Sequence, residues 1–185
     1  MTTQETTQPA RAQRADAKRN IERLLEAARA AIAKDGPDAS LDEIARDAGV
    51  GSGTLYRHFP TRVALLEAVY RDEVARLCAE GDRLLDSDTE PGEALSEWLR
   101  VYVSFGAVKR GLMGPLTTAL GQDSDLFSSC KAMVKSTGGR LVEQAQEAGA
   151  IRKDVEITDV LTLASAIAHA GELTREGSDL SGRLL

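Results

Sequence analysis

Aromatic residues are scarce in this sequence, because Phe, Trp and Tyr together make up 4% of its 185 residues. There is also no long run in which Val, Ile or Thr alternates with polar residues, the pattern that marks half-buried strands. Alanine and leucine are frequent instead. These features predict an all-helical chain, and its length allows one sizeable core or a small domain fused to a larger one.

Cysteine and histidine, which supply most zinc sites and many catalytic pairs, are nearly absent. Cys78 and Cys130 lie far apart with no C-x-x-C spacing, so we expect ordinary buried thiols and neither a disulfide scaffold nor a zinc site. His58 and His169 cannot form a multi-histidine site or a His-based triad within one chain. No phosphate loop, H-E-x-x-H or G-x-S-x-G motif occurs. We therefore expect no enzyme, no metal and no cofactor.

Long apolar runs are missing as well. No stretch approaches the roughly 18 consecutive apolar residues of a membrane-spanning helix. Residues 1–16 are polar and lack the apolar core of a secretory signal. The sequence thus predicts a cytoplasmic protein with no membrane partner, whose residues 1–16 form a disordered basic arm.

The net charge of −6 is unevenly distributed. Residues 1–60 hold nine basic and nine acidic residues, so the remainder of the chain carries the whole excess of negative charge. Residues 9–29 are locally basic and include Arg11, Arg14 and Arg19. Such an arm can lie along a phosphate backbone or reach into a minor groove, and the alternative is a solvated tail.

Residues 40–60 carry the most specific pattern in the chain, because they describe two short helices around a tight turn. Ser40 and Glu43 form an S-x-x-E capping box, which predicts a helix beginning at residue 41. Apolar residues at helical spacing follow up to Ala48, and Gly49 then permits a left-handed turn. A second helix is expected over residues 52–58. This arrangement is typical of a helix-turn-helix, although a tight helix pair inside a larger bundle is the alternative.

The second of these helices has one apolar side and one polar side. Leu55 and Phe59 lie four residues apart and are expected to face inward. The hydroxyl, phenol and guanidinium groups that remain suit phosphate oxygens and base edges, and they belong to Ser52, Thr54, Tyr56 and Arg57.

Glycines and prolines separate the other expected helices. The first spans residues 17–35 and stops at Gly36-Pro37, and a long helix follows Thr61 to about residue 85. Later helices are expected over residues 92–109, 112–121, 124–148 and 156–175. Gly138-Gly139 falls inside one of them, which favours a kink or the close approach of a neighbour.

The run AGVGSGTLYRHF followed by PTRVALLEAVY closely resembles the DNA-binding segment of the tetracycline-repressor (TetR) family of bacterial transcription regulators. The resemblance covers roughly residues 20–70. Family members commonly have serine after AGV, where this chain has Gly51, and glycine caps a helix only slightly less well. The matching residues are Ser40, Ile44, Ala45, Ala48, Gly49, Val50, Gly53, Thr54, Tyr56, Phe59 and Arg62.

The resemblance implies an all-α protein with a three-helix DNA-binding head at residues 17–60. A long fourth helix would join this head to a ligand-binding and dimerisation bundle at residues 61–185. It further implies a homodimeric regulator, of repressor type by analogy with the family, that leaves a palindromic double-stranded DNA operator when a small apolar or amphipathic effector binds. The alternative is a helical small-molecule-binding protein or enzyme in which the helix-turn-helix is only structural.

Three sets of site residues follow. DNA contacts are expected from Arg19, Ser40, Ser52, Gly53, Thr54, Tyr56, Arg57, His58 and Arg62. The effector pocket is expected among the large side chains Trp98, Tyr102, Phe105, Met113, Leu116, Leu120, Phe127 and Met133, some of which line it, while plain core is the alternative for each taken alone. The dimer interface that the family implies is expected on the small apolar stripe Leu161, Ala164, Ala168 and Gly171, for which packing within one subunit is the alternative.

Overall fold

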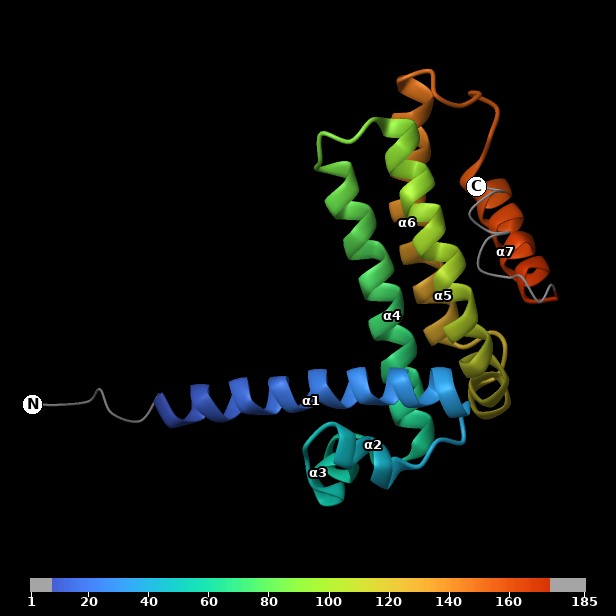
Figure 1. The fold of residues 1–185 in the computed structure, drawn as a ribbon. Coiled ribbons are helices and arrows are strands. Elements are labelled where there is room, and N and C mark those ends of the chain that lie inside the picture. The colour runs from blue at the N-terminus through green and yellow to red at the C-terminus, as the bar shows by residue number, and fades with distance from the viewer. Residues whose placement is uncertain (1–7, 174–185) are drawn as a thin grey trace, which may run out of the picture. The chain divides into compact units, whose positions relative to one another are not determined.

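The computed structural model describes residues 8–173, within which the chain forms seven α-helices and no strand (Figure 1). The all-α expectation is therefore confirmed. No helix in this part of the chain combines the length and the apolarity needed to cross a membrane. The helices are α1 (Gln8–Asp35), α2 (Leu41–Asp47), α3 (Ser52–His58), α4 (Arg62–Leu85), α5 (Pro91–Leu120), α6 (Asp125–Glu147) and α7 (Ile157–Leu173).

The chain divides into two compact units, and the division falls between Val69 and Tyr70, inside α4. The expected boundary after residue 60 lies at the beginning of that helix. The first helix also begins earlier than expected, since α1 starts at Gln8 and takes in residues 8–16 of the expected disordered arm. These residues are mostly Ala, Arg and Gln, which favour helix without forming an apolar stripe, so periodicity alone misses them.

Helix α5 runs without a break through the two helices expected at residues 92–109 and 112–121. Pro115 lies inside it, and a proline within a helix costs about 3 kcal/mol. Leu112 and Leu116, on either side of the proline, are completely buried. Burying each leucine contributes about 1.5–3 kcal/mol, so packing of the continuous helix outweighs the proline.

In the first unit, α2 and α3 form the expected bent pair (Figure 1). The Glu43 amide donates to Ser40 Oγ over 3.4 Å, which caps α2 at its N-terminus. Gly49 follows with φ 66°, a left-handed conformation that a β-carbon would strain. The Val50 amide then donates back to the Ala45 carbonyl over 2.9 Å and closes the turn.

Arg62 holds the loop before α2 against the beginning of α4. Its Nη1 donates to the carbonyl oxygens of Pro37 and Ala39 over 2.9 and 2.7 Å. Both bonds are partly buried, and the guanidinium is charged, so they are stronger than average protein hydrogen bonds. Arg62 therefore has a structural role in this unit.

Trp98 organises the core of the second unit. It is completely buried, and its indole Nε1 donates to the Leu77 carbonyl over 3.0 Å, which fixes α5 against α4. A β-carbon on Gly138 would lie only 2.6 Å from Trp98 Cη2 and 2.6 Å from Ile157 Cδ1. The close approach of a neighbour that Gly138-Gly139 predicted is therefore found at Gly138.

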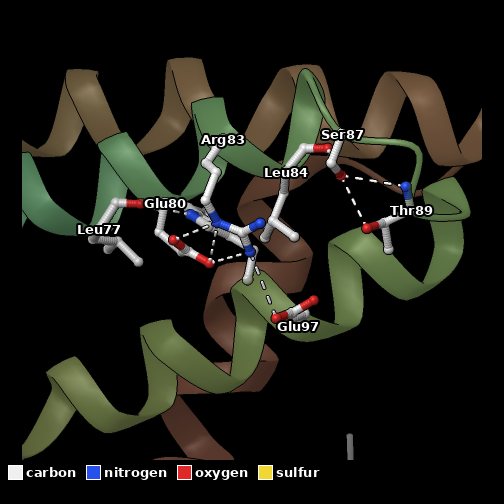
Figure 2. Close-up of polar contacts among 8 residues, drawn as sticks. Leu77, Glu80, Arg83, Leu84, Ser87, Thr89 and Glu97 are labelled. Carbon is white, nitrogen blue, oxygen red and sulfur yellow. Dashed lines mark hydrogen bonds and ion pairs between the residues drawn. The ribbon is translucent and has the colours of Figure 1, made fainter.

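Polar contacts join the ends of α4 and α5, as Figure 2 shows. Arg83 Nη2 lies 2.6 Å from Glu80 and 3.7 Å from Glu97, while Ser87 Oγ donates to the Leu84 carbonyl over 2.8 Å. Exposed ion pairs of this kind contribute at most about 1 kcal/mol each. They reinforce a helix pair whose packing depends mainly on the buried indole.

Candidate nucleic-acid interface and ligand cavity

Helix α3 is anchored on one side and open on the other. Leu55 and Phe59 are buried, as their four-residue spacing predicted. On the opposite side Tyr56 is 47% exposed, and Arg57 is exposed as well. A large aromatic residue and a guanidinium left in solvent on one short helix are available to bind another molecule.

The open side of α3 contains most of the DNA contacts expected from the sequence. Gly53 is exposed, and a β-carbon there would meet nothing within 4 Å. Ser52, Thr54 and His58 are partly exposed. The packing of the protein itself thus does not require glycine at position 53, and the bare backbone leaves room for close approach from outside.

A depression of about 400 Å³ separates this helix from α1. It is lined by Asp16, Ala17 and Asn20 of α1 and by Thr54, Arg57 and His58 of α3. Arg19 lies beside it on the exposed surface of α1 and is paired with Asp16. The sequence did not single out Asn20, although its position four residues after Asp16 places both on one helix face.

Two expected DNA contacts form hydrogen bonds with the protein's own backbone. Ser40 Oγ accepts the Glu43 amide, and Arg62 Nη1 donates to two backbone carbonyls. A hydroxyl at a helix N-cap and a guanidinium aimed at a loop satisfy backbone groups that would otherwise lack partners. We therefore leave both residues out of the DNA-contacting set proposed below.

The second unit contains a cavity of about 490 Å³ between α4, α5, α6 and α7, hereafter the cavity. Four of the expected pocket residues line it: Tyr102, Phe105, Met113 and Phe127. The other four do not. Trp98 and Leu116 are completely buried core, Leu120 lies outside the lining, and Met133 is 46% exposed on the surface of α6.

The pocket prediction missed ten of the fourteen residues that line the cavity. Tyr70 comes from α4 and Lys109 from α5, and the others, which include two more lysines, come from α6 and α7. The spacing of Phe127, Val134 and their neighbours along α6 was a usable signal, but the intervening charges obscured it. The missed residues are Tyr70, Lys109, Cys130, Lys131, Val134, Lys135, Thr158, Leu161, Thr162 and Ser165.

Four aromatic side chains, Tyr70, Tyr102, Phe105 and Phe127, form an aromatic wall of the cavity. The ring of Tyr70 lies 5.9 Å from Phe127 in an edge-on arrangement and 6.1 Å from Phe105. Burial is the main cause that raises the pKa of Tyr70 to about 12. Its hydroxyl is therefore a neutral donor at physiological pH.

Tyr102 also connects α5 with α7. Its hydroxyl lies 3.1 Å from Ser165 Oγ, which itself donates to the Leu161 carbonyl over 2.7 Å. Since the serine proton is already engaged, Tyr102 acts as the donor in the bond between the two helices. One residue of the aromatic wall is thus hydrogen-bonded to α7.

The small stripe on α7, which we expected at a dimer interface, packs mainly within its own subunit. Ala164 and Ala168 are buried, and Leu161 lines the cavity. Ala168 Cβ would lie 3.3 Å from a β-carbon on Gly106 of α5, so small residues are required here by α5. Gly171 belongs to α7, but its surroundings lie outside the described part of the structure.

A three-helix head that exposes the second helix of a helix-turn-helix, joined to a helical unit with an internal cavity, defines the class of helix-turn-helix regulators. Comparison with known families agrees with this class. Residues 24–69 match the family described as "Bacterial regulatory proteins, tetR family". Residues 90–185, more than half of the chain, match the "Transcriptional regulator SbtR-like, C-terminal domain".

Solved structures of TetR regulators are similar over nearly the whole length. One from Streptomyces coelicolor is 38% identical, with 89% of this chain and 93% of that chain covered and a TM-score of 0.78. One from Mycobacterium vanbaalenii is 39% identical, with 85% and 95% covered and a TM-score of 0.72. An uncharacterised helix-turn-helix regulator, TtgW of Pseudomonas putida, is 44% identical over 61 residues, which are 32% of this chain and 46% of that protein. The chain belongs to the TetR family of transcriptional regulators, which are not enzymes.

Proposed function

We propose that the chain acts as a homodimeric repressor that binds a palindromic operator and leaves it when a small apolar or amphipathic ligand enters the cavity. The exposed face of α3 is the observation on which DNA recognition depends. Two such helices about 34 Å apart would enter successive major grooves on one side of the duplex. Because its target is chromosomal DNA, we expect the protein to act in the cytoplasm.

The DNA-contacting set that we propose consists of the open side of α3 and the adjoining part of α1. Tyr56 and Arg57 are the exposed anchors, and Gly53 permits the backbone to approach a phosphate. Hydroxyl groups and arginine are suited to phosphate oxygens, while arginine can also read guanine. The remaining members are Arg19, Ser52, Thr54 and His58.

Helix α4 is proposed to couple the cavity to the head. It begins with Arg62, which holds the loop before α2, and continues to Tyr70, which lines the cavity. A ligand that favours one position of α4 shifts the spacing of the two recognition helices. Unequal affinity for the two arrangements is sufficient, and a coupling of about 1–3 kcal/mol changes DNA affinity about 5- to 150-fold.

For the dimer interface we propose the outer faces of α6 and α7 in place of the buried stripe. Leu163 on α7 is 63% exposed, and Met133 on α6 is also exposed in the single chain. Large apolar side chains left in solvent on neighbouring helices favour burial against a second copy.

The decisive experiment is selection of DNA from a random pool by the full-length protein. A recovered palindrome whose half-sites are about one helical turn apart supports the proposal, and binding should weaken steeply with salt. Tyr56→Ala and Arg57→Ala should lower affinity for that operator by about tenfold each, while Arg152→Ala, an exposed arginine of the second unit, should not. Failure to recover any sequence, or equal affinity of all four proteins, would refute it.

A further inference from the structure

Three of the residues that line the cavity are lysines, and none is acidic. Lys109 comes from α5, and Lys131 and Lys135 come from consecutive turns of α6. These three are called the lysine cluster below. An apolar cavity that collects three ammonium groups and no carboxylate has a positive potential.

The lysine cluster is not neutralised by the protein. Across the described residues, no carboxylate lies within ion-pair distance of Lys109, Lys131 or Lys135, and the one hydrogen bond of the cluster joins Lys135 Nζ to Thr158 Oγ1 over 3.3 Å. Elsewhere in this unit Arg140 does pair with a carboxylate, since its guanidinium lies 2.7 Å from Asp82. Among the described residues, the positive charge of the cavity therefore has no counter-charge.

Lys109 is the least solvated member of the cluster. Burial and the nearby ammonium of Lys131 lower the pKa of Lys109. An ammonium that is partly buried beside a like charge is costly, and an anion placed between the two groups would reverse that cost.

Tyr70 supplies an independent indication that a polar ligand enters. Its residue is only 6% exposed, it lines the cavity, and among the residues that the structure describes its hydroxyl forms no hydrogen bond. The hydroxyl oxygen is not one of the buried unpartnered atoms of the described residues, so it reaches the open space of the cavity. A ligand acceptor in the cavity would satisfy it.

We propose that the cavity takes a small amphipathic anion, a carboxylate or phosphate monoester, whose charged group is bound by Lys109 and Lys131 and whose apolar body lies against the aromatic wall. The inference rests on the proposed ligand response and names the class of ligand. The volume of about 490 Å³ lies within the range of about 300–1,000 Å³ that small-molecule sites occupy. Electrostatic attraction to the cluster selects the head group, and burial of the chain supplies most of the affinity.

Four probes with one decyl chain and different head groups test this inference: decanoate, decyl phosphate, decanol and decyltrimethylammonium. Calorimetric titration of the full chain should give an affinity for at least one of the two anions that is about tenfold or more above that for decanol, with the cation weakest. The comparison of decanoate with decyl phosphate identifies which anion is preferred. Raising the salt concentration should weaken binding of the anions and leave decanol nearly unchanged.

Variants locate the effect. Lys109→Met should lower affinity for the preferred anion by about tenfold and affinity for decanol by less than about threefold. Lys153→Met removes the same charge from an exposed position outside the cavity and should change neither. If circular dichroism shows that Lys109→Met does not fold, Lys131→Met carries the same expectation, because its side chain is exposed and dispensable for packing.

Equal affinity for decanol and both anions, no change in either lysine variant, or no binding of any probe would each overturn the inference. Operator affinity measured with and without the preferred anion separates it from the proposed function. Lysine-dependent binding of the anion that leaves operator affinity unchanged supports the ligand class and refutes ligand-controlled release. Release of DNA by decanol but by neither anion supports ligand-controlled release and refutes the anionic ligand class.

Discussion

Gly138 and Gly139 are neighbours in α6, yet replacing each with alanine should change stability in opposite directions. A β-carbon on Gly138 would lie 2.6 Å from both Ile157 Cδ1 and Trp98 Cη2, whereas one on Gly139 would meet nothing within 4 Å. The end of an isoleucine side chain can move aside. The indole of Trp98 cannot, because it is completely buried and is held by its bond to the Leu77 carbonyl.

The magnitudes follow from two competing terms. Alanine gains about 1 kcal/mol over glycine in a helix interior, and this is the whole effect expected for Gly139→Ala. Forcing an extra methyl group into a packed core costs about 1–3 kcal/mol, with the upper part of that range expected against a fixed ring. Gly138→Ala should therefore be destabilised by about 1–2 kcal/mol, and the two variants should differ by about 2–3 kcal/mol.

Urea unfolding followed by circular dichroism measures this difference, with protein concentration held constant because the proposed dimerisation would contribute to stability. In thermal unfolding the same difference corresponds to about 2–4 °C for each kcal/mol in a chain of this length. Fluorescence of Trp98, the single tryptophan of the chain, should change in Gly138→Ala and not in Gly139→Ala. If Gly138→Ala unfolds at the same or a higher urea concentration than Gly139→Ala, the close contact with Trp98 does not control this position.

Three further predictions concern other parts of the chain. Arg62→Met should lower the free energy of unfolding by about 1–3 kcal/mol, because two backbone carbonyls lose their hydrogen-bond donor. Arg71→Met, on the exposed side of the same helix, should change it by no more than about 0.5 kcal/mol. If Arg62→Met unfolds normally in urea but binds the operator more weakly, Arg62 belongs among the DNA contacts. Tyr70 resists ionisation in the folded protein, with a pKa of about 12 against an ordinary 10.0, so stability is unaffected by this group below pH 10 and is lost as pH rises toward 12. Tyr70→Phe should lose less stability between these pH values in urea titrations, and parallel losses in both proteins would contradict the burial of the phenol. Leu163→Asp should reduce the mass measured by light scattering from dimer to monomer without changing the circular-dichroism spectrum, and a dimer that persists would place the interface elsewhere.

The elements of the head could be predicted closely from the sequence because their signals are local. Each signal involves residues that are close together in the sequence, so a local pattern is enough to predict it. The signals are the Ser40 cap, the left-handed turn at Gly49, and the shared face of Leu55 and Phe59. Arg62 shows where this fails. Its hydrogen bonds go to Pro37 and Ala39, more than twenty residues earlier in the chain. The sequence shows only that a basic residue follows the recognition helix, and this is the same whether the residue binds DNA or a loop.

Boundaries went wrong where a local signal competed with packing. The break expected between residues 109 and 112 is absent, because α5 continues and buries Leu112 and Leu116. The stripe of Ala164 and Ala168 suggested an interface, although α5 of the same subunit fills that space. Small residues permit close approach by any helix, so the sequence shows that a neighbour comes near without showing whose helix it is.

Most of the cavity lining could not be predicted from the sequence, for a reason that also explains its chemistry. A search for large apolar side chains finds Phe105 and Phe127, yet it passes over Lys109 and Lys131 because lysine normally marks a solvated face. Lysine stems are apolar, however, and can line a cavity while the ammonium remains at its edge. The lysines that a hydrophobic pattern excludes are therefore the residues that give this cavity its positive charge. In helical chains, lysines next to aromatic positions are candidates for the lining of a ligand site.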